Sequence, residues 1–240
     1  MPCAKAGCYA GAMNYLFTPP AIPSLPVMGD ERRFPVRRIF CIGRNYADHA
    51  REMGAMVERS QPTFFTKPAD AIVSDGGDVP YPSATSMLHH EVEMVVALAE
   101  GGRDIDPSRA SQLIFGHAVG LDLTRRDLQG VAKKKGLPWD TAKAMDHGAP
   151  VSALCPVTSA APAPDTMLSL HVNDQLRQTT RLEAMLWTVP EIISELSKLF
   201  ELKAGDLIFT GTPAGVAALE PGDRFHAELA GLAVLDGHIL

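Results

Sequence analysis

Runs of apolar residues bounded by turn-forming residues recur along the chain and predict more strands than helices. Residues 91–98 (EVEMVVAL) form the strongest such run. The last twenty residues are interpreted as two strands, with turns at 221–223 and at Asp236-Gly237. Further strands are predicted at 38–43, 64–67, 113–123 and 206–211, with a hairpin over 168–179.

Helical periodicity is confined to two segments. Residues 189–200 (VPEIISELSKLF) predict an amphipathic helix with Pro190 in its first turn, and residues 45–53 predict a short helix that ends before Gly54. Because helices do not alternate with the strands, a doubly wound parallel sheet is a poor fit. We therefore predict a β-rich α+β fold with mixed sheet and a few peripheral helices.

Composition narrows the range of functions. The chain has 240 residues, 46% of them apolar, and a formal net charge of −6, which is typical of a globular domain and argues against a broad nucleic-acid surface. No apolar run approaches the roughly 20 residues that a membrane-spanning helix needs. Residues 1–13 lack the apolar stretch of a signal peptide and are interpreted as a disordered leader. Cys41 and Cys155 are expected to be buried free thiols, and we expect a cytoplasmic protein.

Glu91 and Glu93 are the most informative pair of residues. They alternate in a predicted strand, so both side chains point to one face. Asp122 ends another apolar strand, where an unpaired carboxylate would be costly. Three converging carboxylates would suit Mg²⁺ or Mn²⁺, whereas a solvated strand edge is the alternative. The adjacent His89 and His90 could be ligands, support the ligands from behind or face solvent, and the second arrangement is favoured.

His49 and Glu52 lie three residues apart in a predicted helix, so they share a face and the carboxylate could orient the imidazole. A histidine held in this way can act as a general base toward water. An ordinary polar helix face would have the same spacing. Gly43 and Gly54 flank the segment, which would let it move as a lid.

Basic residues close to these segments could bind an anionic group. Lys143 stands apart from its neighbours, Arg126 follows Asp122 by four residues, and Lys67 ends a predicted strand. Each could hold a carboxylate or a developing oxyanion. The lysine run at 133–135, in contrast, has the usual pattern of a solvated face.

The glycine-flanked loop at 210–215 (TGTPAG) follows a predicted strand. It lacks the GKS or GKT ending of a Walker phosphate loop. Its backbone N–H groups and the Thr212 hydroxyl could bind a carboxylate, although a simple turn would have the same composition.

Seven motifs follow one another along the chain: IGRNYADHAREMG (42–54), FFTKPADAIV (64–73), LHHEVEMVV (88–96), GLDLTRRDLQ (120–129), KKKGLPWDTAK (133–143), VNDQLRQ (172–178) and GDLIFTGTPAGV (205–216). Together and in this order they resemble the fumarylacetoacetate hydrolase family, and the resemblance runs from Phe34 to Leu240. It implies a β-rich roll of mixed sheet, usually assembled as a homodimer. We divide the chain into a leader and small extended segment at 1–36 and one catalytic domain at 37–240.

The same resemblance implies a role for the candidate residues. Mg²⁺ or Mn²⁺ would be bound by the residues that match the family's metal ligands, here Glu91, Glu93 and Asp122. A lid helix would carry a catalytic His–Glu pair, and an active-site lysine would complete the catalytic set, here His49, Glu52 and Lys143. Three residues match positions near the substrate, and Lys67 is added from its place in the sequence, so the predicted substrate-binding set is Arg126, Gln129, Thr212 and Lys67.

The family likeness predicts metal-dependent hydrolysis of a carbon–carbon bond in an acylpyruvate, a small diketo acid. The segments FPVRRIFCIGRNYADHAREMG and GLPWDTAKAMDHGAP look most like the branch that cleaves fumarylpyruvate to fumarate and pyruvate. The large N-terminal domain of the members that cleave fumarylacetoacetate is absent, which makes that compound a poor substrate. Oxaloacetate decarboxylation, isomerisation of a hydroxymuconate-type acid and a catalytically silent metal-binding protein are the alternatives. The His49–Glu52 pair favours hydrolysis, because hydrolysis requires an activated water.

Overall fold

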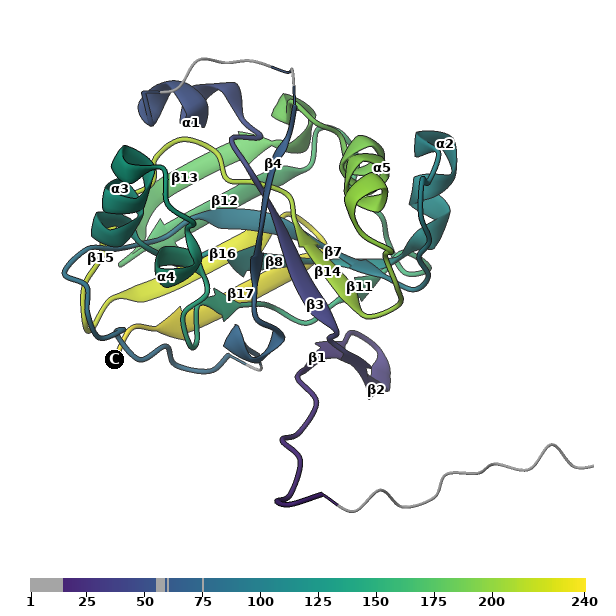
Figure 1. Cartoon of the computed structure of the whole chain (residues 1–240), viewed down its shortest axis with the longest axis horizontal. Coiled ribbons are helices and arrows are strands. Elements are labelled where there is room, and N and C mark those ends of the chain that lie inside the picture. Colours follow the sequence, from purple (N-terminus) through teal and green to yellow (C-terminus); the bar gives the residue numbers. More distant parts are fainter. Residues whose placement is uncertain (1–14, 55–58, 60, 75) are drawn as a thin grey trace, which may run out of the picture.

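Two sheets stacked face to face form the centre of the molecule, and helices lie around their edges (Figure 1). The computed structural model describes residues 15–54, 59, 61–74 and 76–240. The predicted β-rich α+β fold with mixed sheet and few peripheral helices is confirmed. The predicted leader at 1–13 lies outside the described residues, and the domain boundary at residue 36 stays a prediction.

The larger sheet has six strands in the order β11-β8-β7-β14-β3-β4. β14 and β3 are parallel and the other neighbouring pairs are antiparallel, so the sheet is mixed. All residues of the central strand β7 are buried, as expected for a strand covered on both faces. The strands are β3 (Arg38–Gly43), β4 (Thr63–Lys67), β7 (Val92–Leu98), β8 (Ile114–Leu121), β11 (Cys155–Pro156) and β14 (Asp206–Phe209).

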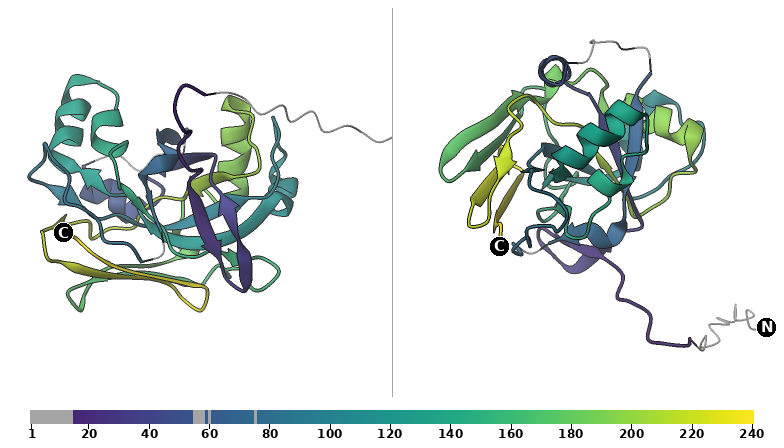
Figure 2. Two further views of the ribbon diagram at one scale, coloured as in Figure 1. Left: turned by 90° about the horizontal axis from the view of Figure 1, so that it is seen from below. Right: turned by 60° about the vertical axis from the view of Figure 1, so that its left-hand side comes forward.

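The second sheet is antiparallel, has the order β13-β12-β16-β17, and forms a separate layer in Figure 2. Alternate side chains, such as those of Leu168, Leu170 and Ala227, face β7 and β8 and fill the core between the sheets. The opposite face carries polar and exposed side chains. The strands are β12 (Met167–Val172), β13 (Gln175–Arg181), β16 (Arg224–Leu229) and β17 (Ala233–His238).

The final hairpin turns at a different place from the one predicted. The turn at 221–223 is confirmed, but Asp236-Gly237 lies inside β17, and the chain turns at 230–232, where Gly231 has a φ of 71°. Gly237 is required for another reason, because a Cβ there would lie 2.4 Å from the Phe225 ring on the neighbouring strand. This glycine therefore permits close packing across the sheet.

Short strands cover the other face of the larger sheet and its end. The hairpin of β1 and β2 packs Leu25 and Phe34 against Ile39 and Phe209. Cys41 lies in the same cluster and is a buried free thiol, as is Cys155, so both predictions are confirmed. The short strands are β1 (Ser24–Val27), β2 (Asp30–Pro35), β5 (Ile72–Val73), β6 (Leu88–His89), β9 (Thr124–Arg125), β10 (Ala149–Pro150) and β15 (Ala218–Leu219).

The helices close the edges of the two layers. α5 starts with the reciprocal hydrogen bonds of a capping box between Thr188 and Glu191 and buries Ile192 and Leu196 in the core between the sheets. In the described residues, no helix combines the length and apolar character required to cross a bilayer. The helices are α1 (Ala47–Glu52), α2 (Pro107–Ala110), α3 (Arg126–Lys135), α4 (Asp140–Lys143) and α5 (Val189–Leu199), with 3₁₀ turns at 69–71, 111–113 and 182–184.

Candidate active site

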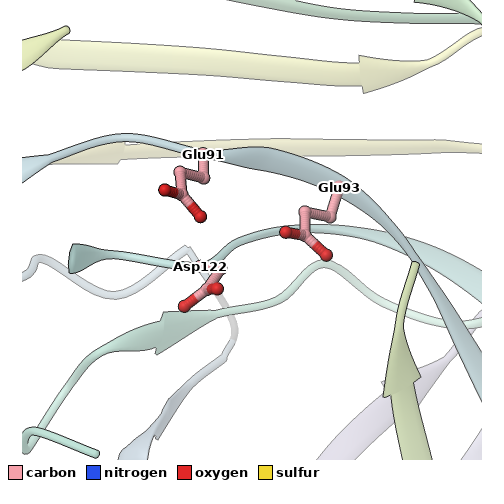
Figure 3. Close-up of side chains that lie close together, drawn as sticks. All are labelled: Glu91, Glu93 and Asp122. Atoms are coloured by element: carbon pink, nitrogen blue, oxygen red, sulfur yellow. The ribbon is translucent and has the colours of Figure 1, made fainter. Parts of the chain in front are cut away.

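Three buried carboxylates meet where β7 begins and β8 ends. Glu91 directly precedes β7, Glu93 is the second residue of β7, and Asp122 directly follows β8. Because Val92 pairs with Leu121, the antiparallel register brings the three side chains to one end of the sheet. One oxygen from each lies within 4.8 Å of the others, and Figure 3 shows the carboxylates facing one another. We call Glu91, Glu93 and Asp122 the carboxylate cluster.

The electrostatics of the carboxylate cluster call for a cation. Burial, reinforced by the charges of Asp122 and Glu91, raises the pKa of Glu93 well above its ordinary value. Burial acts on Glu91 in the same sense, but Lys143 and Arg126 outweigh it and hold the pKa of Glu91 below its usual range. A divalent cation would supply the positive charge that Glu93 lacks. Buried oxygen donors held on strand ends fit a hard cation such as Mg²⁺ or Mn²⁺.

Lys143 at the end of α4 contacts two members of the carboxylate cluster. Its Nζ donates to Glu91 Oε2 at 2.7 Å and to Asp122 Oδ2 at 2.6 Å, and the side chain is almost fully buried. Burial disfavours its charge, but Asp122 and Glu91 outweigh this effect and raise the pKa of Lys143 above its ordinary value. Lys143 is therefore a protonated hydrogen-bond donor within the site.

Lys67 lies behind the carboxylate cluster. Its Nζ donates to Asp122 Oδ1 at 2.7 Å and to the backbone oxygens of Leu123 at 3.0 Å and Lys143 at 2.6 Å. An ammonium group has three donors, so these bonds use all of them, and Lys67 is not among the residues that line the pocket. This placement favours positioning of Asp122 and α4 over the substrate contact predicted from the sequence.

α1, at the top of the molecule in Figure 1, carries both His49 and Glu52. His49 Nδ1 lies 3.3 Å from Glu52 Oε2, and the Glu52 carboxylate also accepts the Gly215 N–H at 3.1 Å. Burial lowers the pKa of His49, although the nearby carboxylates of Glu91 and Glu52 oppose the shift. A neutral, buried and oriented imidazole has the properties of a general base.

The first turn of α3 supplies Arg126 and Gln129. Arg126 donates to Glu91 and, at 2.5 Å, to Gln129 Oε1. Its Nε lies 3.4 Å from Nδ1 of His89, and burial together with the charge of Arg126 lowers the pKa of His89 to about 4. Arg126 thus links α3 to the carboxylate cluster. His89 contacts Arg126 rather than the carboxylates, which is the supporting place favoured from the sequence.

The loop at 210–215 connects the carboxylate cluster to α1. The Gly211 N–H donates to Glu93 Oε2 at 2.6 Å, while Gly215 reaches Glu52. Gly211 has a φ of 93°, and a Cβ there would lie 2.6 Å from the Cβ of Asn45. Glycine at this position therefore lets the loop pack closely against Asn45. Thr212, the next residue, lines the pocket.

Gln178 was not identified from the sequence as a member of the site, yet it positions Thr212. Its buried amide donates to Thr212 Oγ1 at 2.8 Å and accepts from the Val92 N–H at 3.1 Å, and its Oε1 lies 2.8 Å from Nδ1 of His90. β13 is polar apart from the exposed Leu176, so no apolar alternation marks Gln178 as inward. A simple hairpin around Asn173-Asp174 would pair Leu170 with Arg177, and the bulge that instead brings Gln178 opposite Leu170 has no signal in the sequence.

Asn45 is a second residue that sequence reasoning missed. It is fully buried; its Nδ2 donates to Thr210 O at 2.8 Å and to Trp187 O at 3.0 Å, and its Oδ1 accepts the Trp187 N–H at 2.7 Å. Asn45 thereby ties the start of α1 to the loop at 210–215. These partners are more than a hundred positions away in the sequence, which local pattern cannot reveal.

All predicted site residues except Glu52 and Lys67 line one pocket, and both exceptions contact a residue at its edge. The pocket residues are Ile42, Gly43, Arg44, His49, Met53, Phe65, Glu91, Glu93, Asp122, Arg126, Gln129, Lys133, Trp139, Lys143 and Thr212.

This geometry is accompanied by a match over most of the chain. A family model described as fumarylacetoacetate (FAA) hydrolase C-terminal matches residues 38–240. The chain belongs to the fumarylacetoacetate hydrolase family. Its similarity to other members of that family is substantial in both sequence and fold.

Two curated relatives of the chain carry different names. A mitochondrial oxaloacetate tautomerase of Rattus norvegicus is 42% identical over 196 residues, which cover 82% of this chain and 88% of that protein. A fumarylpyruvate hydrolase of a Ralstonia species is 41% identical over 183 residues, which cover 75% of this chain and 95% of that protein.

A solved structure extends the likeness to the fold. The crystal structure of fumarylpyruvate hydrolase from Pseudomonas aeruginosa, in complex with Mn²⁺ and pyruvate, is 44% identical with a TM-score of 0.92. The match covers 95% of this chain and 99% of that one. The resemblance to the fumarylpyruvate-cleaving branch of the family, first indicated by the motifs, is thus confirmed.

Proposed function

We propose that the protein hydrolyses the carbon–carbon bond of an acylpyruvate with the help of a divalent metal, and that fumarylpyruvate is its substrate. The observation that carries the proposal is the placement of His49 and the carboxylate cluster on the walls of a single pocket. The structural relative that binds Mn²⁺ and pyruvate supports it, because pyruvate is one product of acylpyruvate cleavage.

Glu91, Glu93 and Asp122 would hold the metal. When bound, Mg²⁺ or Mn²⁺ supplies Lewis-acid polarisation and a template for the keto-carboxylate end of the substrate. Lys67, Lys143 and Arg126 form ion pairs with Glu91 and Asp122, whereas Glu93 forms none within the described residues. A divalent ion would therefore leave the pocket with a net positive charge, which suits an anionic diketo acid.

His49 takes the proton from the attacking water in this proposal. Its Nδ1 faces Glu52, so its Nε2 is the free nitrogen that can accept the proton. Glu52 stabilises the imidazolium that forms, and the Gly215 N–H keeps that carboxylate in place. Burial keeps His49 neutral before the reaction, so it is ready to act at neutral pH.

The bond changes balance without any further reactant. The water oxygen adds to the carbonyl carbon of the acyl group, the bond from that carbon to the pyruvyl methylene breaks, and the methylene carbon takes a proton. One product is the acid formed from the acyl group, and the other is pyruvate. Lys143 donates its remaining hydrogen bond to the charge that develops, and Thr212, held by Gln178, binds the carboxylate of the substrate.

Arg126 and Gln129 are proposed to orient the substrate from α3. Their mutual hydrogen bond and the Arg126–Glu91 contact hold both side chains at the pocket wall. Lys67 is proposed to act through Asp122 and α4 rather than by touching the substrate. Assembly as a homodimer and a cytoplasmic location stay predictions.

Interconversion of oxaloacetate tautomers is the second candidate, because several relatives named oxaloacetate tautomerase are about as similar in sequence as the fumarylpyruvate hydrolase. It needs a base to move a proton at carbon but no attacking water. Both reactions use the same metal-binding residues and His49, so the products formed distinguish them. The tautomerase relatives fit the predicted alternative of an enzyme that acts on oxaloacetate. Isomerisation of a hydroxymuconate-type acid stays an alternative as well, because a 5-carboxymethyl-2-hydroxymuconate delta-isomerase of known structure is 30% identical to this chain.

The test is to incubate the purified protein and Mg²⁺ with fumarylpyruvate, acetylpyruvate or oxaloacetate and to follow the enol absorbance while products are identified. We expect chelator-sensitive loss of fumarylpyruvate with equal amounts of fumarate and pyruvate. Faster enol–keto exchange of oxaloacetate, with no cleavage of either acylpyruvate, would replace hydrolysis with tautomerisation.

A further inference from the structure

Two cations at the pocket wall have no anionic partner in the described part of the chain. Arg44 follows β3, and Lys133 lies in the last turn of α3, so the two side chains approach from different elements. Arg126 and Lys143, in contrast, are both paired with the carboxylate cluster. The pocket therefore contains two cations that hold its own carboxylates and two that do not.

The backbone holds Arg44 in an unusual conformation. Its φ is 61°, in the left-handed region that non-glycine residues seldom adopt. Asn45, the next residue, is buried and anchored to Thr210 and Trp187. The chain thus retains backbone strain at an exposed arginine of the pocket wall, and such strain is common at functional sites.

Lys133 differs from the rest of its lysine run. Its Nζ lies 5.3 Å from the centre of the Trp139 ring, and Lys133 lines the pocket whereas Lys134 and Lys135 do not. Burial, Arg126 and Arg44 together lower the pKa of Lys133. The solvated face predicted for 133–135 therefore describes the last two lysines only.

From this arrangement we infer that Arg44 and Lys133 bind a second carboxylate, at the end of the substrate remote from the metal ligands. The inference rests on the proposed function and specifies its substrate class as acylpyruvates with a distal carboxylate. Two neighbouring cations without a counterion repel each other, and an anion placed between them removes that repulsion and gains charge-assisted hydrogen bonds.

The wall beside these cations suits a flat substrate. Phe65 and Trp139 lie with ring centres 5.7 Å apart and both line the pocket. Their rings present apolar surface to a conjugated four-carbon acyl group such as the fumaryl group, whose terminal carboxylate would then reach Arg44 and Lys133. An acetyl group is too short to reach them and has no charge to offer.

The experiment compares fumarylpyruvate with the analogue in which only its distal carboxylate is a methyl ester. The variants are Arg44→Gln, Lys133→Gln and the double variant, with Lys135→Gln as the matched control on the same helix. We expect the ratio of kcat/KM for the diacid to that for the ester to fall about tenfold in each single variant and about 100-fold in the double variant. Most of the change should be in KM, and the control should keep the wild-type ratio.

A wild-type ratio in the double variant would overturn the inference, whether kcat/KM stays the same for both compounds or falls by the same factor for both. If wild-type protein with Mg²⁺ cleaves neither compound, the proposed function fails. Carboxylate binding by Arg44 and Lys133 is then tested by calorimetric titration with both compounds. In that case a preference for the diacid that disappears in the double variant supports the inference, and a preference that persists refutes it.

Discussion

The carboxylate cluster can be compared with a second group of titratable side chains, on the outer face of the four-stranded sheet. We call this group the outer-face cluster; it comprises His171, His226, Asp236 and His238. In the second region His226 Nδ1 lies 2.7 Å from Asp236 Oδ1, yet the two side chains are 46% and 69% exposed. In the first, Glu91, Glu93 and Asp122 are at most 5% exposed. Water screens the outer-face cluster, whereas the carboxylate cluster must be neutralised by the protein or by a bound ion.

The comparison teaches that residue type alone does not distinguish the two regions. A histidine beside a carboxylate occurs in both, as His49–Glu52 and as His226–Asp236. Only the first pair has a buried imidazole that faces other functional groups across a pocket. Substitutions in the two regions should therefore have effects of very different size.

The largest effect is expected for Glu93→Gln. Loss of a metal ligand should reduce turnover by about 10⁴-fold, because a bound metal contributes several kcal/mol to transition-state stabilisation. The metal-free variant should also melt at a higher temperature than the metal-free wild type, since a buried carboxylate with a raised pKa is replaced by a neutral isostere. Thermal melts with and without Mn²⁺ test both points. Stabilisation of the variant by Mn²⁺ equal to that of the wild type would exclude Glu93 as a ligand.

His49→Ala and His226→Ala form the next test. Removal of a general base should lower kcat by about 10²- to 10⁴-fold, while Mn²⁺ affinity is retained because His49 is not a ligand in the proposal. The exposed His226 serves as the control, and its loss should change kcat less than twofold. Similar kcat values for the two variants would remove His49 from the mechanism.

The pH dependence of kcat should show the burial of His49. Because a base must be neutral, activity is lost as the pH falls through the pKa of His49, which burial lowers below its ordinary value of 6.5. The acid limb of the profile should therefore lie below pH 6.5. Glu52 raises this pKa, so Glu52→Gln should move the limb to still lower pH while reducing kcat. A shift to higher pH in that variant would contradict the assignment of the pair.

Stability, rather than turnover, separates a buried ion pair from an exposed one, and the exposed pair should show the smallest effect. Lys67→Met leaves Asp122 and two backbone oxygens without their donor, and it should lower the free energy of unfolding by about 3–5 kcal/mol. Asp236→Asn breaks an exposed pair and should cost about 0.5 kcal/mol. Urea titrations measure both. Equal values would mean that burial does not control these energies.

Much of the fold followed from the sequence because its strongest signals are local. The apolar runs at 91–98, 113–123 and 206–211 became β7, β8 and β14, and the amphipathic segment at 189–200 became α5 at Val189–Leu199. The turn predicted at Asp236-Gly237 was wrong, because a glycine that allows close contact with Phe225 cannot be told from a turn glycine by sequence alone. Sequence pattern does not separate these two uses.

The site was predictable where chemistry is carried by rare residue types. Carboxylates in an apolar strand, such as Glu91 and Glu93, are conspicuous, and the family resemblance supplied the remaining candidates. Lys67 was assigned to the substrate because nothing local shows that Asp122 lies in front of it. Gln178 and Arg44 escaped notice because a polar strand and an exposed arginine look ordinary until tertiary structure places them at a pocket.

The loop at 210–215 sets the spacing between Glu93 and Glu52, because one of its ends is bonded to each of them. A single inserted or deleted residue would displace the proposed metal ligand and the partner of the proposed base together. Laboratory evolution of new substrate range should therefore find few useful length variants in this loop. Accepted changes should gather instead at positions such as Arg44 and Lys133, which can be replaced without moving the backbone that holds the carboxylates.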